Sequence, residues 1–96
     1  MKCNLVFSAF SIKKALDVYL FIWEGCKTED YHSFEDIRKT LRIGASNCRR
    51  ITNRLARVGL IESVKDTRYE DRRKKAYVVC NPNFANSLEY LMLTFG

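Results

Sequence analysis

The sequence predicts one α+β domain over residues 1–96, a winged helix-turn-helix with an added C-terminal helix. Three observations lead to this prediction. The composition, 47% apolar and 29% charged, is that of a small globular domain. Two segments with helical spacing of apolar residues are joined only by the short turn "RIGAS". Two strand-like segments, "LIESVK" and "KKAYVVC", follow that pair and enclose a charged tip.

A first helix is expected at about residues 9–24, where apolar side chains cover most of the helix surface. A helix this apolar has to be covered on more than one side. Because a chain of 96 residues offers little material for that, a second subunit is the expected cover. The main apolar stripe consists of Ile12, Ala15, Leu16, Tyr19, Ile22 and Trp23.

The two helices of the helix-turn-helix are expected at about residues 33–41 and 45–58. Ser33 has the position of an N-cap, with Asp36 as the acid of a capping box. The second of these helices is the recognition helix, and Gly59 follows it as a left-handed C-terminal glycine. Its inward stripe is formed by Cys48, Ile51, Leu55 and Val58.

A β-hairpin, the wing, is expected at about residues 60–80, and a last helix at about residues 83–95. Asn81 followed by Pro82 is a typical N-cap and first-turn proline, which places the start of that helix.

The net charge of +6 is concentrated in the middle of the chain. Residues 42–75 contain eleven Lys/Arg and four Asp/Glu, a balance of +7, and all other residues together have a balance of −1. This concentration favours a polyphosphate partner, because each neutralised phosphate releases condensed counterions. Double-stranded DNA is therefore the expected partner.

The outward face of the recognition helix carries side chains that read base edges, and no acid occurs between Gly44 and Ile61. Arg binds guanine O6 and N7 with two hydrogen bonds, and Asn binds adenine in the same way. The candidate DNA-binding residues of this helix are Ser46, Asn47, Arg49, Arg50, Asn53, Arg54 and Arg57. Wing cations can reach phosphates or a narrow minor groove, and the candidates are Arg68, Arg72, Arg73 and Lys74.

Residues 37–79, "IRKTLRIGASNCRRITNRLARVGLIESVKDTRYEDRRKKAYVV", resemble the DNA-binding core of the MarR-type winged-helix regulators. "EDRR" at 70–73 matches the Asp-Arg-Arg wing signature of that family. The resemblance implies a wing arginine in the minor groove, Arg72 or Arg73, with Asp71 as its anchor. The chain is shorter than family members whose flanking helices enclose a ligand pocket, which argues against a small-molecule effector. In its compactness the chain is also similar to regulators of archaea and archaeal viruses.

The first and last helices are expected to pair across a two-fold axis and form a homodimer. A two-fold dimer presents two recognition helices about 34–36 Å apart, which suits a pseudo-palindromic DNA site. The candidate interface residues are Leu16, Tyr19, Leu20, Trp23, Leu88, Leu91, Met92 and Phe95.

No cofactor, metal site or catalytic site is expected. The four cysteines, Cys3, Cys26, Cys48 and Cys80, lack metal-ligand spacing and are either reduced thiols or a disulfide of unknown pairing. No spacing places a second base or a nucleophile beside the lone His32, so an enzyme is not expected. Without a signal-peptide pattern or an apolar run long enough to span a membrane, the expected location is the cytoplasm, or the host cytoplasm for a viral protein.

Three functions remain open at this point. Asn47, Asn53 and the arginines favour a sequence-specific transcription regulator. A sequence-tolerant architectural DNA-binding protein would use the same positive charge. A winged-helix protein-interaction module would place the basic face against an acidic protein.

Overall fold

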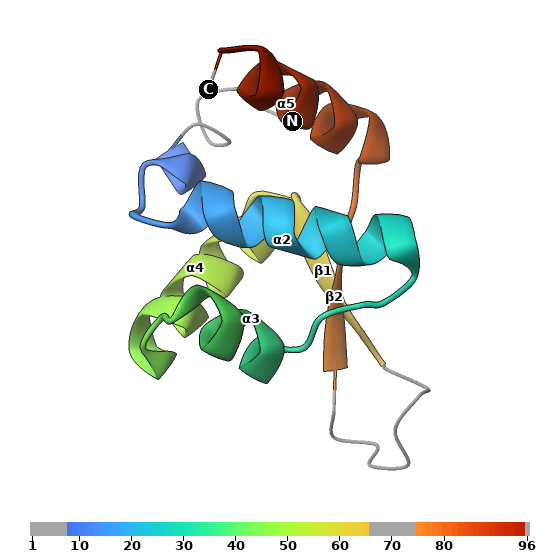
Figure 1. The fold of residues 1–96 in the computed structure, drawn as a ribbon. Helices are drawn as coiled ribbons and strands as arrows, with labels where there is room; N and C mark the ends of the chain where they lie inside the picture. Colours follow the sequence, from blue (N-terminus) through green and yellow to red (C-terminus); the bar gives the residue numbers. More distant parts are fainter. Residues whose placement is uncertain (1–7, 66–74, 96) are drawn as a thin grey trace.

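The computed structural model describes residues 8–65 and 75–95. After helical residues 8–10 come α2 (Ala15–Thr28), α3 (Phe34–Leu41), α4 (Ala45–Arg57), the strands β1 (Ile61–Lys65) and β2 (Lys75–Val79), and α5 (Pro82–Phe95). In Figure 1, α2 crosses the middle of the molecule, with α5 on one side and the α3–α4 pair on the other. The predicted winged helix-turn-helix with an added C-terminal helix is confirmed.

The first long helix is displaced from its predicted position. α2 begins at Ala15, not near residue 9, because residues 11–14 form a turn that ends with Lys14 in left-handed backbone, φ 69°. It continues past Gly25 to Thr28 instead of ending near residue 24. A Cβ on Gly25 would lie 2.8 Å from the carbonyl oxygen of Asp30. This glycine therefore does not end the helix; it lets the following loop pack closely against it.

The helix-turn-helix has the caps that the sequence predicts. The Ser33 hydroxyl accepts from the backbone N–H of Asp36 at 3.2 Å, and the Asp36 carboxylate accepts from the N–H of Ser33 at 3.0 Å. α3 ends at Leu41, and its C-cap Arg42 has left-handed backbone, φ 54°; α4 begins after Gly44. Gly59, φ 83°, turns the chain out of α4 and into β1.

The described part of the wing is a two-stranded antiparallel sheet tied to the helix-turn-helix. Lys65 lies opposite Lys75 at the end nearest the tip, and the tip itself is outside the described residues. A single β-bridge joins Ser33 to β2, and the N–H of Tyr77 donates to the carbonyl oxygen of His32 at 3.0 Å. The wing strand and the start of α3 are therefore fixed to each other.

The structure removes Tyr19 from the predicted dimer interface, because this side chain is fully buried within the chain. Its ring contacts Phe10 at 5.5 Å and Phe84 at 6.1 Å between centroids. Residues 8–10 and the start of α5 thus cover the face of α2 that was expected to need a second subunit. The other α2 candidates, Leu16, Leu20 and Trp23, are half-buried.

α5 is anchored at its first half and exposed at its second half. Asn81 caps it by accepting from the N–H of Phe84 at 3.1 Å. Lys27 of α2 forms an ion pair with Glu89 at 2.7 Å.

No helix of the described residues is both long and apolar enough to cross a membrane.

Candidate DNA-binding face

Packing of α4 against the core decides which of its side chains face outward. Cys48, Ile51 and Leu55 are buried, as the predicted stripe requires, and Val58 is half-buried. Thr52 is buried as well, and its hydroxyl donates to the carbonyl oxygen of Cys48 at 3.0 Å. The seven predicted contact residues of this helix are all exposed: Ser46, Asn47, Arg49, Arg50, Asn53, Arg54 and Arg57.

Within the part of the chain that the structure describes, no acidic side chain pairs with the arginines of this face. The ion pairs of the described residues involve Lys27 and Arg38, which lie on α2 and α3, and none involves an arginine of α4. Arg38 pairs with Glu35 at 2.9 Å, and both residues belong to α3, so the Glu35 carboxylate is engaged within that helix. The α4 guanidinium groups therefore remain available to an anionic partner.

Arg49 differs from the other arginines of α4 because an aromatic ring holds it. Its guanidinium carbon lies 5.0 Å from the centroid of the Phe34 ring, a cation–π contact between α4 and the first residue of α3. This contact restricts the Arg49 side chain to the α3 side of the face.

A second group of cations lies beside the N-terminal end of α4 and was not predicted from the sequence. A hollow of about 230 Å³ separates the turn before α2 from the turn between α3 and α4. We call it the basic notch, and its lining consists of Lys13, Lys14, Arg42, Ile43, Gly44 and Asn47. The pair "KK" before the first helix is visible in the sequence, but nothing in its spacing places it next to residue 42.

Like charges also face each other on the wing, at the end of the two strands nearest the tip. Lys65 and Lys75 occupy directly opposed positions of the two strands, and both are exposed. Opposed like charges destabilise a sheet unless an anion lies between or beside them. The wing candidates Arg68, Arg72, Arg73 and Lys74 lie outside the described residues.

Solved structures that resemble the chain cover nearly all of it. Reduced HlyU from Vibrio cholerae N16961 matches with a TM-score of 0.73 and 14% identity over 96% of this chain and 86% of that one. The MepR–DNA complex of S. aureus matches with a TM-score of 0.72 and 14% identity over 93% and 70%. The transcriptional regulator HlyU from Vibrio vulnificus CMCP6 gives 0.71 and 13% over 97% and 86%. The chain has the winged-helix fold.

At 13–14% identity these likenesses show the fold alone, and that fold is the winged helix-turn-helix that the sequence predicts. No protein-family model and no curated protein matches the sequence.

The described cysteines of this winged-helix chain are free thiols: Cys26, Cys48 and Cys80. Burial raises the pKa of each thiol, which keeps it protonated near neutral pH and lowers its reactivity. Cys26 accepts a hydrogen bond from the N–H of Val79 at 3.5 Å. Cys3 lies outside the described residues, which contain no group of His, Cys, Asp or Glu arranged to hold a metal ion.

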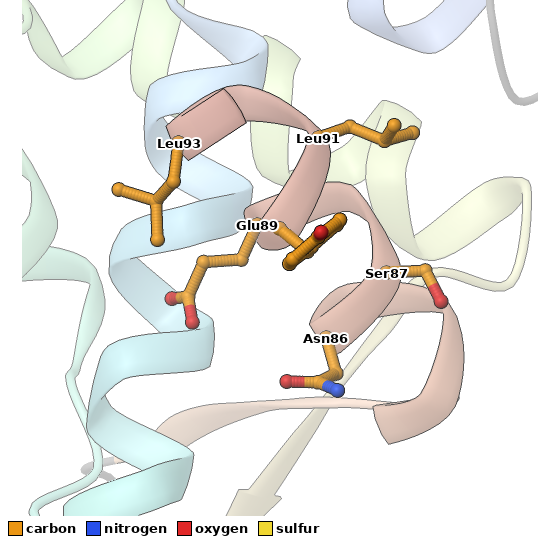
Figure 2. A pocket seen from close by; sticks show the side chains of 6 residues that line it. Asn86, Ser87, Glu89, Leu91 and Leu93 are labelled. Atoms are coloured by element: carbon orange, nitrogen blue, oxygen red, sulfur yellow. The ribbon is translucent and has the colours of Figure 1, made fainter. Parts of the chain in front are cut away.

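The C-terminal half of α5 carries four consecutive exposed apolar side chains. Tyr90, Leu91, Met92 and Leu93 are 69%, 49%, 41% and 81% exposed. A hollow of about 550 Å³ runs along the helix there, and all of its lining side chains come from α5 itself (Figure 2). A hollow with one wall does not enclose a small molecule.

Proposed function

We propose that this winged-helix chain is a sequence-specific DNA-binding transcription regulator that acts as a homodimer in the cytoplasm. The observation that carries the proposal is the outward face of α4, which exposes four arginines and two asparagines and contains no acid. The buried stripe of Cys48, Ile51 and Leu55 fixes which way that face points. Solved proteins of the same fold include one bound to DNA and one described as a transcriptional regulator, which supports the same use here.

In the proposed mode of binding, α4 enters the major groove. An α-helix with its side chains is about 10–12 Å wide, and the major groove is about 12 Å wide. Arg50, Asn53 and Arg54 then face base edges, while Arg49 is held to one side by Phe34. The wing follows the backbone or the adjacent minor groove, with Arg68, Arg72, Arg73 and Lys74 as its proposed contacts.

The homodimer is proposed from the exposed end of α5. Exposed apolar patches of this kind on small domains commonly mark protein contacts. The interface would consist of Leu91 and Met92 with their neighbours Tyr90 and Leu93, and Leu88 at its edge. A two-fold arrangement of two chains would place their α4 helices on successive turns of one face of the duplex.

Selection of genomic DNA fragments by the purified protein, at about 150 mM salt, tests the proposal. Specific regulators favour their site by about 10³–10⁷ over random duplex. Enrichment of one inverted repeat with half-sites near one helical turn apart is the expected result. Equal recovery of all fragments would instead identify an architectural DNA-binding protein. Failure to bind any duplex at low salt would leave the protein-interaction module.

A further inference from the structure

The basic notch brings together cations from two turns that are far apart in the sequence. Lys13 and Lys14 come from the turn before α2, and Arg42 comes from the turn between α3 and α4. Among the described residues, no ion pair engages any of the three. Lys14 donates to the carbonyl oxygen of Leu41 at 3.2 Å, a bond that holds the two turns together without neutralising the charge. Three positive charges around one hollow repel each other unless an anion occupies it.

Two of the residues that line the basic notch also have an unusual backbone conformation. Lys14 and Arg42 both have left-handed backbone, with φ of 69° and 54°. Residues with side chains rarely adopt this conformation, and Asn or Gly adopts it more easily. Two long basic side chains therefore occupy positions where a smaller residue would fit the backbone better.

The end of α4 adds donors to the same hollow. Gly44 is the N-cap and provides no side-chain hydrogen bond, and the first bond within the helix runs from the N–H of Cys48 to the carbonyl oxygen of Gly44 at 2.9 Å. The N–H groups of the first turn consequently lack partners within the helix and point out of its end. Asn47 lines the notch and belongs to the proposed DNA-binding face, so the notch and that face are continuous.

We infer that the basic notch binds a backbone phosphate of the DNA duplex whose major groove α4 enters. This inference rests on the proposed function and adds Lys13, Lys14 and Arg42 to the DNA contacts. A helix of 13 residues is about 20 Å long, more than the roughly 12 Å width of the groove, so one of its ends lies beside a phosphate strand. A phosphate held in the notch fixes how far α4 slides along the groove and therefore which base pairs Arg50 and Asn53 face.

The test is the salt dependence of duplex binding by Lys13→Gln and Arg42→Asn, separately and combined. Lys14 is left intact because its bond to Leu41 supports the fold. Asn83→Asp is the matched control, since it also lowers the net charge by one but lies in the first turn of α5, across α2 from α4 (Figure 1). Loss of one phosphate contact is expected to reduce the slope of log K against log [salt] by about 0.9 and the affinity by about fivefold at 0.15 M salt.

Arg42→Asn also separates binding from folding. Asn tolerates left-handed backbone better than Arg, so the melting temperature is expected to stay level or rise while the affinity falls. An unchanged salt slope in the double variant overturns the inference and leaves the regulator proposal standing. An equal loss in Asn83→Asp also overturns it, because net charge alone then explains the effect. A wild-type chain that binds no duplex at low salt refutes the proposed function itself.

Discussion

Replacement of Gly25 by Ala tests how α2, the loop after it and the wing are joined. A Cβ at this position would lie 2.8 Å from the carbonyl oxygen of Asp30 and 2.8 Å from Cδ2 of His32, whereas ordinary contacts begin near 3.4 Å. The carbonyl belongs to the backbone and cannot rotate away. His32 is stacked on Phe21 with ring centroids 3.9 Å apart, so it can move only by breaking that contact.

The expected magnitude is the difference between two effects. Ala is favoured over Gly inside a helix by about 1 kcal/mol, and overpacking of this kind costs about 1–3 kcal/mol. Because one of the two close contacts is with backbone, we take the upper part of that range and expect a net loss of about 1–2 kcal/mol. For a domain of this size each kcal/mol lowers the melting temperature by about 4–8 °C.

Thermal unfolding followed by circular dichroism measures this loss, with Gly44→Ala as the control. Nothing lies within 4 Å of a Cβ built on Gly44, so the control should change stability by only about 0.5 kcal/mol, the difference between Gly and Ala at an N-cap. A melting temperature for Gly25→Ala at or above that of the wild type would refute the packing argument. The backbone carbonyl oxygen of His32 accepts from the N–H of Tyr77. A displaced His32 should therefore change the amide resonances of β2 as well.

Four further predictions concern individual side chains. Tyr19→Phe should raise stability by about 1 kcal/mol, because the buried hydroxyl has no hydrogen-bond partner among the described residues. Burial raises the pKa of Tyr19 from 10.0 to about 12, so the folded chain keeps a proton that the unfolded chain loses. The unfolding free energy of the wild type, compared with Tyr19→Phe, should therefore fall by about 3 kcal/mol as the pH rises through that interval. Equal pH profiles would contradict this. Arg50→Lys keeps the charge but loses the two-pronged donor geometry, so it should cost about 1–3 kcal/mol at one base pair and leave the salt slope unchanged; a uniform loss on all sequences would make Arg50 a phosphate contact. Iodoacetamide, monitored by mass spectrometry, should label exposed Cys80 well before fully buried Cys48, and the reverse order would contradict the observed packing of α4.

The sequence alone predicted those features that depend on one or two neighbouring residues, such as helix caps and left-handed turns. The capping box of Ser33 and Asp36, the left-handed Gly59 and the Asn81 cap all appear where their spacing predicts them. The outward face of α4 follows from its inward stripe in the same way, because a helical period fixes both.

Signals that depend on tertiary contact were not accessible from the sequence. Gly25 has the appearance of a helix end, but the loop that returns over α2 makes it an interior packing residue. Tyr19 has the appearance of an interface residue, but residues 8–10 and α5 fold back to cover it. The basic notch depends on left-handed backbone at Lys14 and Arg42, which no local preference of Lys or Arg predicts.

The exposed end of α5 has a geometric consequence for any protein that binds there. Tyr90, Leu91, Met92 and Leu93 are consecutive, and successive residues of an α-helix are rotated by about 100°. Their side chains therefore point in directions spread over most of the circumference, and Figure 2 shows Leu91 and Leu93 on different sides of the helix. A flat partner surface could cover only part of this ring of side chains. In the proposed homodimer, the second copy would therefore have to contact this end of α5 from more than one side to cover these four side chains.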